Sequence, residues 1–274
     1  MQEARQERIV PLLLYLFTAV TGLIDAVSYI ALGHIFTANM TGNIVLLGFA
    51  LVGVPGLSAL RSLTAFAAFF VGALIGGRLS TRLAPLSSHR WRMTAFGCEA
   101  LFLLGATLTS IGSASVPLDS TRLYAVIVLT ALAMGLRNAT VRKIALPDLT
   151  TTVLTLTITG LAADSSFAGG SNPRWQRRVM SILLMFAGAV VGALLLRHSL
   201  ALPLGLATVS AVCGVAAFYR SSRLEWGDTS MSGKVRKDAH VAYLERSPPR
   251  DRATEISSPL GDQPPTPILR EDKS

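Results

Sequence analysis

The stretch GHIFTANMTGN, residues 33–43, decides how this chain is interpreted. It separates two strongly apolar runs, PLLLYLFTAVTGLIDAVSYIAL at 11–32 and IVLLGFALVGVPGL at 44–57. Long loops outside a membrane are usually charged, but His34 is the only titratable residue in this one, which is rich in Thr, Asn and Gly. It is therefore either an ordinary loop or backbone that enters the bilayer without forming a regular helix.

The composition indicates an integral membrane protein. Of the 274 residues 51% are hydrophobic and 15% are charged, and the mean hydropathy is +0.50. Soluble domains carry about 25% charged residues. Four windows without any charge are each close to the ~20 residues that cross a ~30 Å hydrocarbon core. These windows are 43–60, 62–77, 100–118 and 179–196.

Other classes of protein fit less well. The first apolar run is longer than the core of a signal peptide and contains Asp25. Cys98 and Cys213 lie far apart and show no disulfide framework or metal-ligand spacing. The basic residues flank apolar segments, so we expect no nucleic-acid partner. Catalytic and cofactor motifs such as HExxH, GxSxG and the Walker loop are absent from the sequence, so we expect no enzyme, cofactor or metal.

Six segments are long enough to span the bilayer: about 11–33, 60–79, 93–113, 121–141, 178–197 and 200–219. Two shorter segments, about 43–57 and 150–166, make eight spans if both cross fully, or two re-entrant elements if neither does. With six spans and a cytoplasmic N-terminus, twelve basic residues lie inside and three outside. Six spans satisfy the positive-inside rule better than eight. Both termini are then expected in the cytoplasm.

The sequence also repeats itself. GLIDA (22–26) recurs as GLRNA (135–139), FTANMTGN (36–43) aligns with TTTVLTLT (150–157), and FVGALIGG (70–77) recurs as FAGAVVGA (186–193). Each unit then holds three crossings and one re-entrant element. Because three is odd, the second unit must be inverted relative to the first, as in many secondary transporters. The predicted fold is an all-α polytopic membrane helix bundle with about six spans, two re-entrant or broken short helices and an inverted 3+3 repeat.

The expected organisation has three parts. Residues 1–9 form a cytoplasmic N-terminus, and residues 10–219 form the transmembrane domain, with repeat one at 10–113 and repeat two at 121–219. Residues 220–274 are rich in Ser, Pro, Arg and Asp, with ten Lys or Arg against nine Asp or Glu. This composition predicts a disordered cytoplasmic tail.

Several of these motifs resemble a known bacterial family, the YoaK-type membrane proteins, a domain of unknown function. The resemblance rests on TGLIDAVSYIALGHIFTANMTGNIVLLG, GLRNA and TTTVLTLTITGLAAD, and covers about residues 10–220. The second Thr-rich segment departs from the family pattern, which has an aromatic residue and a Gly roughly where Val153 and Leu156 stand. The resemblance implies a multispanning protein of the bacterial inner membrane, without a settled substrate or catalytic residues.

Asp25 is the sharpest candidate for a functional residue. It lies roughly 5 Å from the middle of the first span. A carboxylate at this depth costs roughly 2.5–3.5 kcal/mol on insertion scales and usually faces a bundle interior or a cavity. Asp25 either binds a coupling ion or proton, or is structural, through an ion pair with Arg137 or hydrogen bonds to a neighbouring broken helix. Asn138 is its counterpart in the second repeat.

Further candidates lie in the two polar stretches. The amides of Asn39 and Asn43 suit a neutral or zwitterionic solute, although Asn also caps helices. The predicted substrate- or ion-binding set is Asp25, Asn39, Thr41, Asn43, Asn138, Thr151, Thr152 and Thr155. Glu99, about one and a half turns inside the third span, is expected to snorkel or to pair with Arg92.

Pairs of glycines four residues apart point to close helix packing. Small residues with this spacing let two membrane helices approach each other closely. The pairs are Gly72 with Gly76, and Gly188 with Gly192. We expect packing, and no binding, from these residues.

These features predict a permease of a small solute or ion, in which one repeat rocks against the other around a site lined by Asp25 and the re-entrant elements. The alternative is a non-transporting membrane scaffold or sensor whose C-terminal tail binds a partner, and a channel is a third reading. The lipid bilayer is the expected surrounding, and a homo-oligomer is left open.

Overall fold

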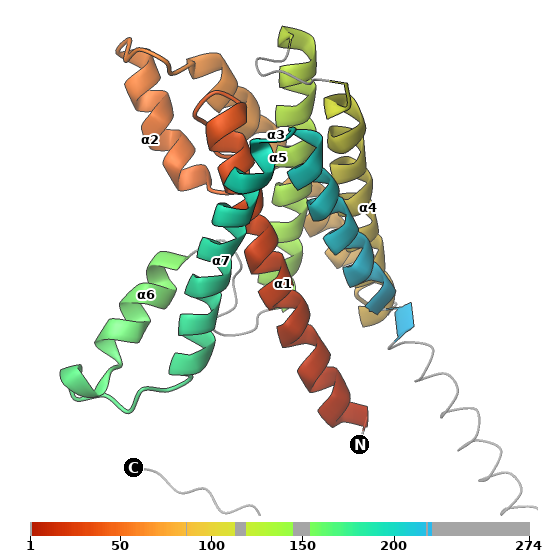
Figure 1. The fold of residues 1–274 in the computed structure, drawn as a ribbon. Helices are drawn as coiled ribbons and strands as arrows, with labels where there is room; N and C mark the ends of the chain where they lie inside the picture. Colours follow the sequence, from red (N-terminus) through yellow and green to blue (C-terminus); the bar gives the residue numbers. More distant parts are fainter. Residues whose placement is uncertain (1, 86, 113–118, 145–153, 218, 221–274) are drawn as a thin grey trace, which may run out of the picture. The chain divides into compact units, whose positions relative to one another are not determined.

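The structure is a computed structural model of the chain. It describes residues 2–85, 87–112, 119–144, 154–217 and 219–220, with the backbone alone for 2–10, 88 and 89. The elements are α1 (Gln2–Ala31), α2 (Met40–Leu51), α3 (Ala59–Leu83), α4 (Ser88–Ser110), α5 (Ser120–Ile144), α6 (Leu154–Ala163), η1 (Ser166–Ala168), α7 (Trp175–Leu196) and an unlabelled helix Ala201–Ala217 (Figure 1). The described residues contain no strand, so the predicted all-α helix bundle is confirmed. The predicted tail, 220–274, lies outside the described residues apart from Arg220.

Helix length separates spanning from non-spanning elements. Five helices are long and apolar enough to cross a membrane: α1 from Pro11, α3, α4 from Arg90, α5 and α7. The sixth predicted span contains Ala201–Ala217, a shorter apolar helix. With 12 and 10 residues, α2 and α6 extend only about 18 and 15 Å, roughly half of a ~30 Å hydrocarbon core. Neither short helix can cross alone.

The end of α1 is set by local backbone chemistry. Gly33 has φ +90°, and the His34 N–H donates to the Tyr29 carbonyl at 3.1 Å. This left-handed residue followed by a return hydrogen bond is the Schellman ending, which glycine favours. Because the bond turns the chain out of the helix, residues 32–39 leave the axis of α1 before α2 begins at Met40.

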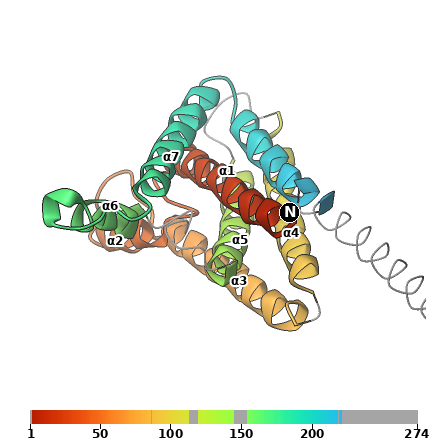
Figure 2. The ribbon, with the colours of Figure 1, turned by 90° about the horizontal axis from the view of Figure 1, so that it is seen from below.

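The helices run in opposite directions in the two halves of the chain (Figure 1). α1 and α5 run antiparallel, and so do α3 and α7. α2 begins part-way along the bundle and ends where α3 starts, whereas α6 ends at the opposite end of the bundle, close to the start of α7. The two short helices therefore occupy opposite ends of the same flank (Figures 1 and 2).

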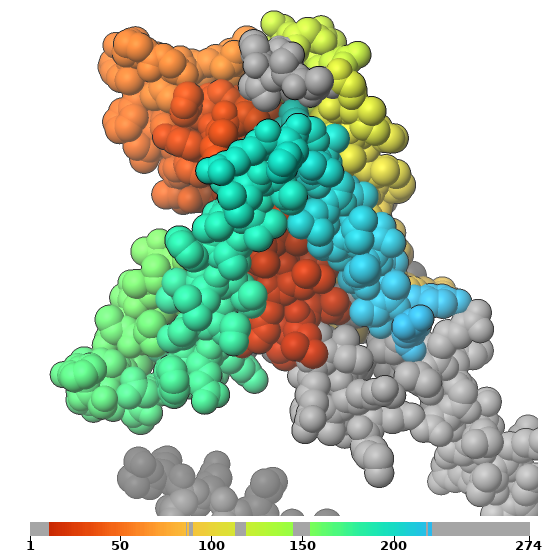
Figure 3. Space-filling model, in the orientation of Figure 1, coloured from red at the N-terminus to blue at the C-terminus, as the bar shows by residue number. Residues whose placement is uncertain are grey.

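α1 and α5 are the central helices. Within their membrane windows 67% and 61% of the residues are buried, against 28% for α3 and 17% for α7. Figure 2 shows α1 and α5 side by side, flanked by α7 and α3. In the space-filling view the lower part of α1 is seen in the gap between α7 and the 201–217 helix (Figure 3). The outer helices present large apolar side chains such as Phe70 and Phe186, as expected for lipid-facing surfaces.

Close glycine contacts join α1 to α7. A Cβ on Gly188 would clash with the Ala19 carbonyl oxygen, and one on Gly192 would lie 2.8 Å from the Leu23 carbonyl oxygen. From the other side, a Cβ on Gly22 would clash with the Met185 carbonyl oxygen. Backbone therefore touches backbone at this crossing, which only glycine permits.

The same crossing occurs between α5 and α3. A Cβ on Gly72 would clash with the Leu132 carbonyl oxygen, one on Gly76 would lie 3.0 Å from that of Leu136, and one on Gly135 would clash with that of Phe69. The contacting residues of α1 and those of α5 are separated by the same number of positions in the sequence, residue for residue. The contacting residues of α7 and α3 are likewise separated by one constant number of positions. Each crossing joins helices from different halves of the chain.

Candidate functional site

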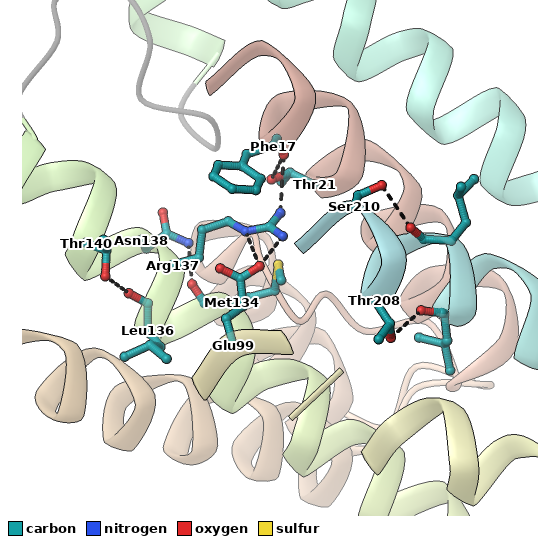
Figure 4. Close-up of polar contacts among 12 residues, drawn as sticks. Phe17, Thr21, Glu99, Met134, Leu136, Arg137, Asn138, Thr140, Thr208 and Ser210 are labelled. Atoms are coloured by element: carbon teal, nitrogen blue, oxygen red, sulfur yellow. Dashed lines mark hydrogen bonds and ion pairs between the residues drawn. The ribbon is translucent and has the colours of Figure 1, made fainter. Parts of the chain in front are cut away.

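A buried ion pair lies at the centre of the bundle. The Arg137 side chain of α5 and the Glu99 side chain of α4 are both fully buried. Arg137 Nε donates to Glu99 Oε1 at 2.8 Å, and its Nη2 donates to the same oxygen (Figure 4). Two donors on one carboxylate oxygen make a charge-assisted interaction, which is the arrangement that allows charges to be buried.

The same guanidinium reaches across to α1. Arg137 Nη1 donates to the Phe17 carbonyl oxygen at 3.2 Å, and Arg137 Cζ lies 4.9 Å from the centroid of the Phe17 ring. That ring stacks on Phe96 of α4 at 4.7 Å between centroids. Arg137 therefore ties together α1, α4 and α5, and uses a hydrogen bond, an ion pair and a cation–π contact to do so.

This geometry corrects two expectations. Arg137 pairs with Glu99, so the predicted pair of Arg137 with Asp25 is wrong. Glu99 is not near a helix end, because α4 begins at Ser88 and places Glu99 in the middle of the helix. A residue at that depth cannot snorkel to the membrane surface and needs an internal partner. The signal in the sequence was the presence of one Arg and one Glu inside different spans.

Asp25 faces the break between α1 and α2. Its side chain is 8% exposed, and its carboxylate lies beside the backbone N–H of Ala38. Oδ1 of Asp25 and Oγ1 of Thr37 are both buried and have no hydrogen-bond partner among the described residues. Thr37 is itself fully buried. The structure thus brings Asp25 to the polar stretch 33–43, which lies eight or more residues later in the sequence.

Asn43 holds the break in shape. Its Oδ1 accepts from the Phe36 N–H at 2.7 Å, and its Nδ2 donates to the Phe36 carbonyl oxygen. Asn43 is 1% exposed, so its amide is used by the backbone. These two bonds supply the partners that non-helical backbone needs at membrane depth. Asn43 therefore positions the break.

Replacing Asn43 with Ala is expected to lower the free energy of unfolding by about 1–3 kcal/mol, the cost of leaving a buried backbone group of Phe36 unpaired. Thermal unfolding of the full chain in lipid nanodiscs measures this loss. Asn39→Ala is the matched control, because Asn39 precedes α2 but makes no side-chain capping bond. Equal losses for both variants would contradict the role given to Asn43.

The structure disperses the other predicted binding residues. Thr41 and Thr155 are exposed, and Asn39 is half-buried. Asn138 donates from Nδ2 to the Met134 carbonyl oxygen of its own helix at 2.9 Å. Thr151 and Thr152 lie outside the described residues. Within the part of the second Thr-rich segment that the structure describes, Thr157 is buried, and sequence reasoning did not single it out as a site residue.

The second short helix is fastened by an ion pair. Arg178 of α7, 6% exposed, lies 2.8 Å from Asp164 Oδ2 and donates to the Gly160 carbonyl oxygen. Asp164 follows α6 directly. One guanidinium therefore donates to a carbonyl oxygen in the last turn of α6 and pairs with the carboxylate that comes just after the helix. This arrangement joins α6 to α7, as Asn43 joins the start of α2 to the break before it. The described residues hold no group of three or more His, Cys, Asp or Glu placed for a metal ion.

Comparisons with known proteins agree with this architecture. Residues 13–219 match the model of the family described as "Protein of unknown function (DUF1275)". The chain is 33% identical over 193 residues to the UPF0700 transmembrane protein YoaK of Bacillus subtilis (strain 168), covering 66% of this chain and 82% of that protein. No solved structure matches the chain. The chain therefore belongs to this family, the YoaK-type transmembrane proteins.

Proposed function

We propose that the protein is a permease of a small solute or ion in the bacterial inner membrane, working by alternating access with both termini in the cytoplasm. The observation that carries the proposal is the pair of equivalent glycine crossings, α1 with α7 and α3 with α5. In Figure 1 the α1–α7 pair runs in the opposite direction to the α3–α5 pair, as an inverted repeat requires. Two copies of one unit in opposite orientation provide two equivalent states, one open to each side.

The crossings also support a choice of the bodies that would move. α1 and α7 form one closely packed pair, and α3 and α5 form the other, whereas α1 and α5 touch each other much less extensively. The moving bodies are therefore not the sequence halves 10–113 and 121–219. Each body takes its central helix from one half of the chain and its outer helix from the other. The Arg137 bond to Phe17 lies between the two bodies.

The break before α2 supports transport, because its polar, non-helical backbone packs beside the apolar helix α1. The polar stretch before α2 would enter the membrane from outside, and the one before α6 from the cytoplasm. In variants lacking Cys98 and Cys213, we expect a cysteine at position 39 to react with an impermeant maleimide from outside only. A cysteine at position 155 should react from the cytoplasmic side only. Reaction of both positions from one side would contradict the inverted repeat.

Flux in proteoliposomes tests the permease itself. Solid-supported membrane electrophysiology with a panel of alkali cations, inorganic anions, amino acids and sugars should give a current that protein-free membranes lack. Asp25→Asn should reduce it by about 10-fold or more, because a mid-membrane carboxylate marks a substrate or ion pathway. Asp119→Asn, at an exposed carboxylate, is the control and should leave the current unchanged.

Removal of residues 221–274 separates the permease from a scaffold or sensor. A permease should keep its current without this segment. Loss of a binding partner from the truncated chain, together with no current from the full chain on any member of the panel, would favour the scaffold.

A further inference from the structure

The break between α1 and α2 lies back alongside α1, at the level of Asp25. α1 ends at Ala31, and Gly33 stands eight residues after Asp25. At 1.5 Å per residue, that glycine is about 12 Å further along the helix axis than Asp25. Ala38 nevertheless lies beside Asp25, and it packs with Ile35 in the same apolar core as Ile24 and Val27 of α1. The chain has therefore folded back alongside α1, and the contact lies well inside the span.

Two oxygen atoms at this contact have unused hydrogen-bonding capacity. They are Asp25 Oδ1 and Thr37 Oγ1, both buried and unpartnered among the described residues. Thr37 directly precedes Ala38, the residue whose N–H lies beside the Asp25 carboxylate. A buried carboxylate oxygen without a partner costs free energy unless a ligand or proton occupies it. Oxygen atoms are also the ligands that hard cations prefer.

The charge of Asp25 is not balanced by the protein in the described residues. Arg137 is engaged by Glu99, Arg178 by Asp164, and the Arg61 guanidinium lies against Gly33. The other titratable side chains on segments that pack against α1 are His34 of the break, Arg90, Arg92, Cys98 and Glu99 of α4, Arg122, Tyr124, Arg142 and Lys143 of α5, Arg177 of α7 and Cys213 of the 201–217 helix. None of the basic ones forms an ion pair with Asp25. One carboxyl group is thus left at membrane depth without a basic partner among the described residues.

We propose that Asp25 and Thr37 form a binding site for a monovalent cation, either an alkali-metal ion or a proton. Asp25 provides the charge and one oxygen, and Thr37 adds a neutral oxygen. Asn43 keeps the break in place through Phe36, so the two oxygens are held by backbone that cannot relax into a helix. The inference deepens the proposed permease, because a cation bound here is either its substrate or its coupling ion.

Thermal unfolding of the full chain in detergent tests the site without any transport. The probes are sodium, potassium and lithium chloride against choline chloride, each at pH 5 and pH 8. A cation at about ten times its dissociation constant should raise the unfolding temperature of the wild type by roughly 3–6 °C. Asp25→Asn should lose this response, and Asp119→Asn, with its exposed carboxylate, should keep it.

Thr37→Val separates the two sources of positive charge. An alkali ion needs the hydroxyl oxygen as a ligand, so the variant should lose most of the sodium, potassium or lithium response. A proton binds the carboxylate alone, so the variant should keep a response to acidification that Asp25→Asn lacks. The same unfolding temperature in all salts and at both pH values would overturn the proposal. A response that persists unchanged in Asp25→Asn would overturn it equally.

The unfolding test of the cation site does not depend on whether the protein is a permease. A cation response without any current leaves the site standing and removes the transport proposal. A current that Asp25→Asn retains, with no cation response, removes the site and leaves transport.

Discussion

Replacing Glu99 with Ala is expected to lower the free energy of unfolding by about 3–5 kcal/mol, the loss seen when one partner of a buried ion pair is removed. The variant leaves the Arg137 guanidinium fully buried, with the Phe17 carbonyl as its remaining hydrogen-bond partner among the described residues. Reversible unfolding of the full chain in mixed micelles measures the change. Glu99→Gln should lose less, because its amide oxygen still accepts a hydrogen bond from Arg137.

A double variant distinguishes two contributions to the free energy of unfolding: the cost of leaving one buried charge unpaired, and the net stabilisation by the ion pair itself. Glu99→Leu combined with Arg137→Met removes both charges, and should be close to the wild type in stability, since apolar replacements of buried pairs are often neutral or better. The exposed pair of Asp119 with Arg122 provides the control, and Arg122→Met there should cost less than about 1 kcal/mol. If Glu99→Ala cost no more than Arg122→Met, Glu99 and Arg137 would not be paired in a dry interior.

Replacing Gly72 with Ala is expected to destabilise the protein by about 1–3 kcal/mol, as overpacking of a tight contact does. The added methyl group meets the Leu132 carbonyl oxygen, which is backbone and cannot rotate away. Gly188→Ala meets the Ala19 carbonyl in the equivalent place on the other crossing, and should cost about the same. Unfolding in the same micelles measures both.

Gly77→Ala is the matched control for Gly72→Ala. Gly77 is on the same helix, and a Cβ added there meets nothing within 4 Å. Alanine is also the better helix former by about 1 kcal/mol, so this variant should be neutral or more stable. A loss at Gly77 as large as that at Gly72 would mean that helix α3 responds to substitution in general, and the close contact with α5 would not be the cause.

The helical membrane fold follows from properties that the sequence carries locally. Long charge-free windows require helices, because backbone groups in a bilayer must bond within their own segment. The polar stretch 33–43, which begins two residues after α1 ends at Ala31, marks the break before α2. The glycine pairs of α3 and α7 are visible as a spacing. All these signals lie within a few turns of one another along the chain.

The partners of the buried polar groups were decided by tertiary structure. The insertion cost of Asp25, Glu99 and Arg137 can be read from the sequence, and it says that each needs compensation. Which residue compensates depends on how far each helix is rotated and where it starts. Because α4 starts earlier than the sequence predicted, Glu99 lies in the middle of this helix, where it pairs with Arg137. Asp25 instead faces the break between α1 and α2.

The sequence by itself determined that this chain is a bundle of apolar helices interrupted by two short polar stretches, since hydrophobicity and helix length are properties of consecutive residues. Tertiary structure alone decided that α1 pairs with α7 and α3 with α5, and that Asn43 binds Phe36 and not a solute. The physical reason is that close packing and hydrogen bonding act between atoms a few ångströms apart, and only the folded backbone brings those atoms together.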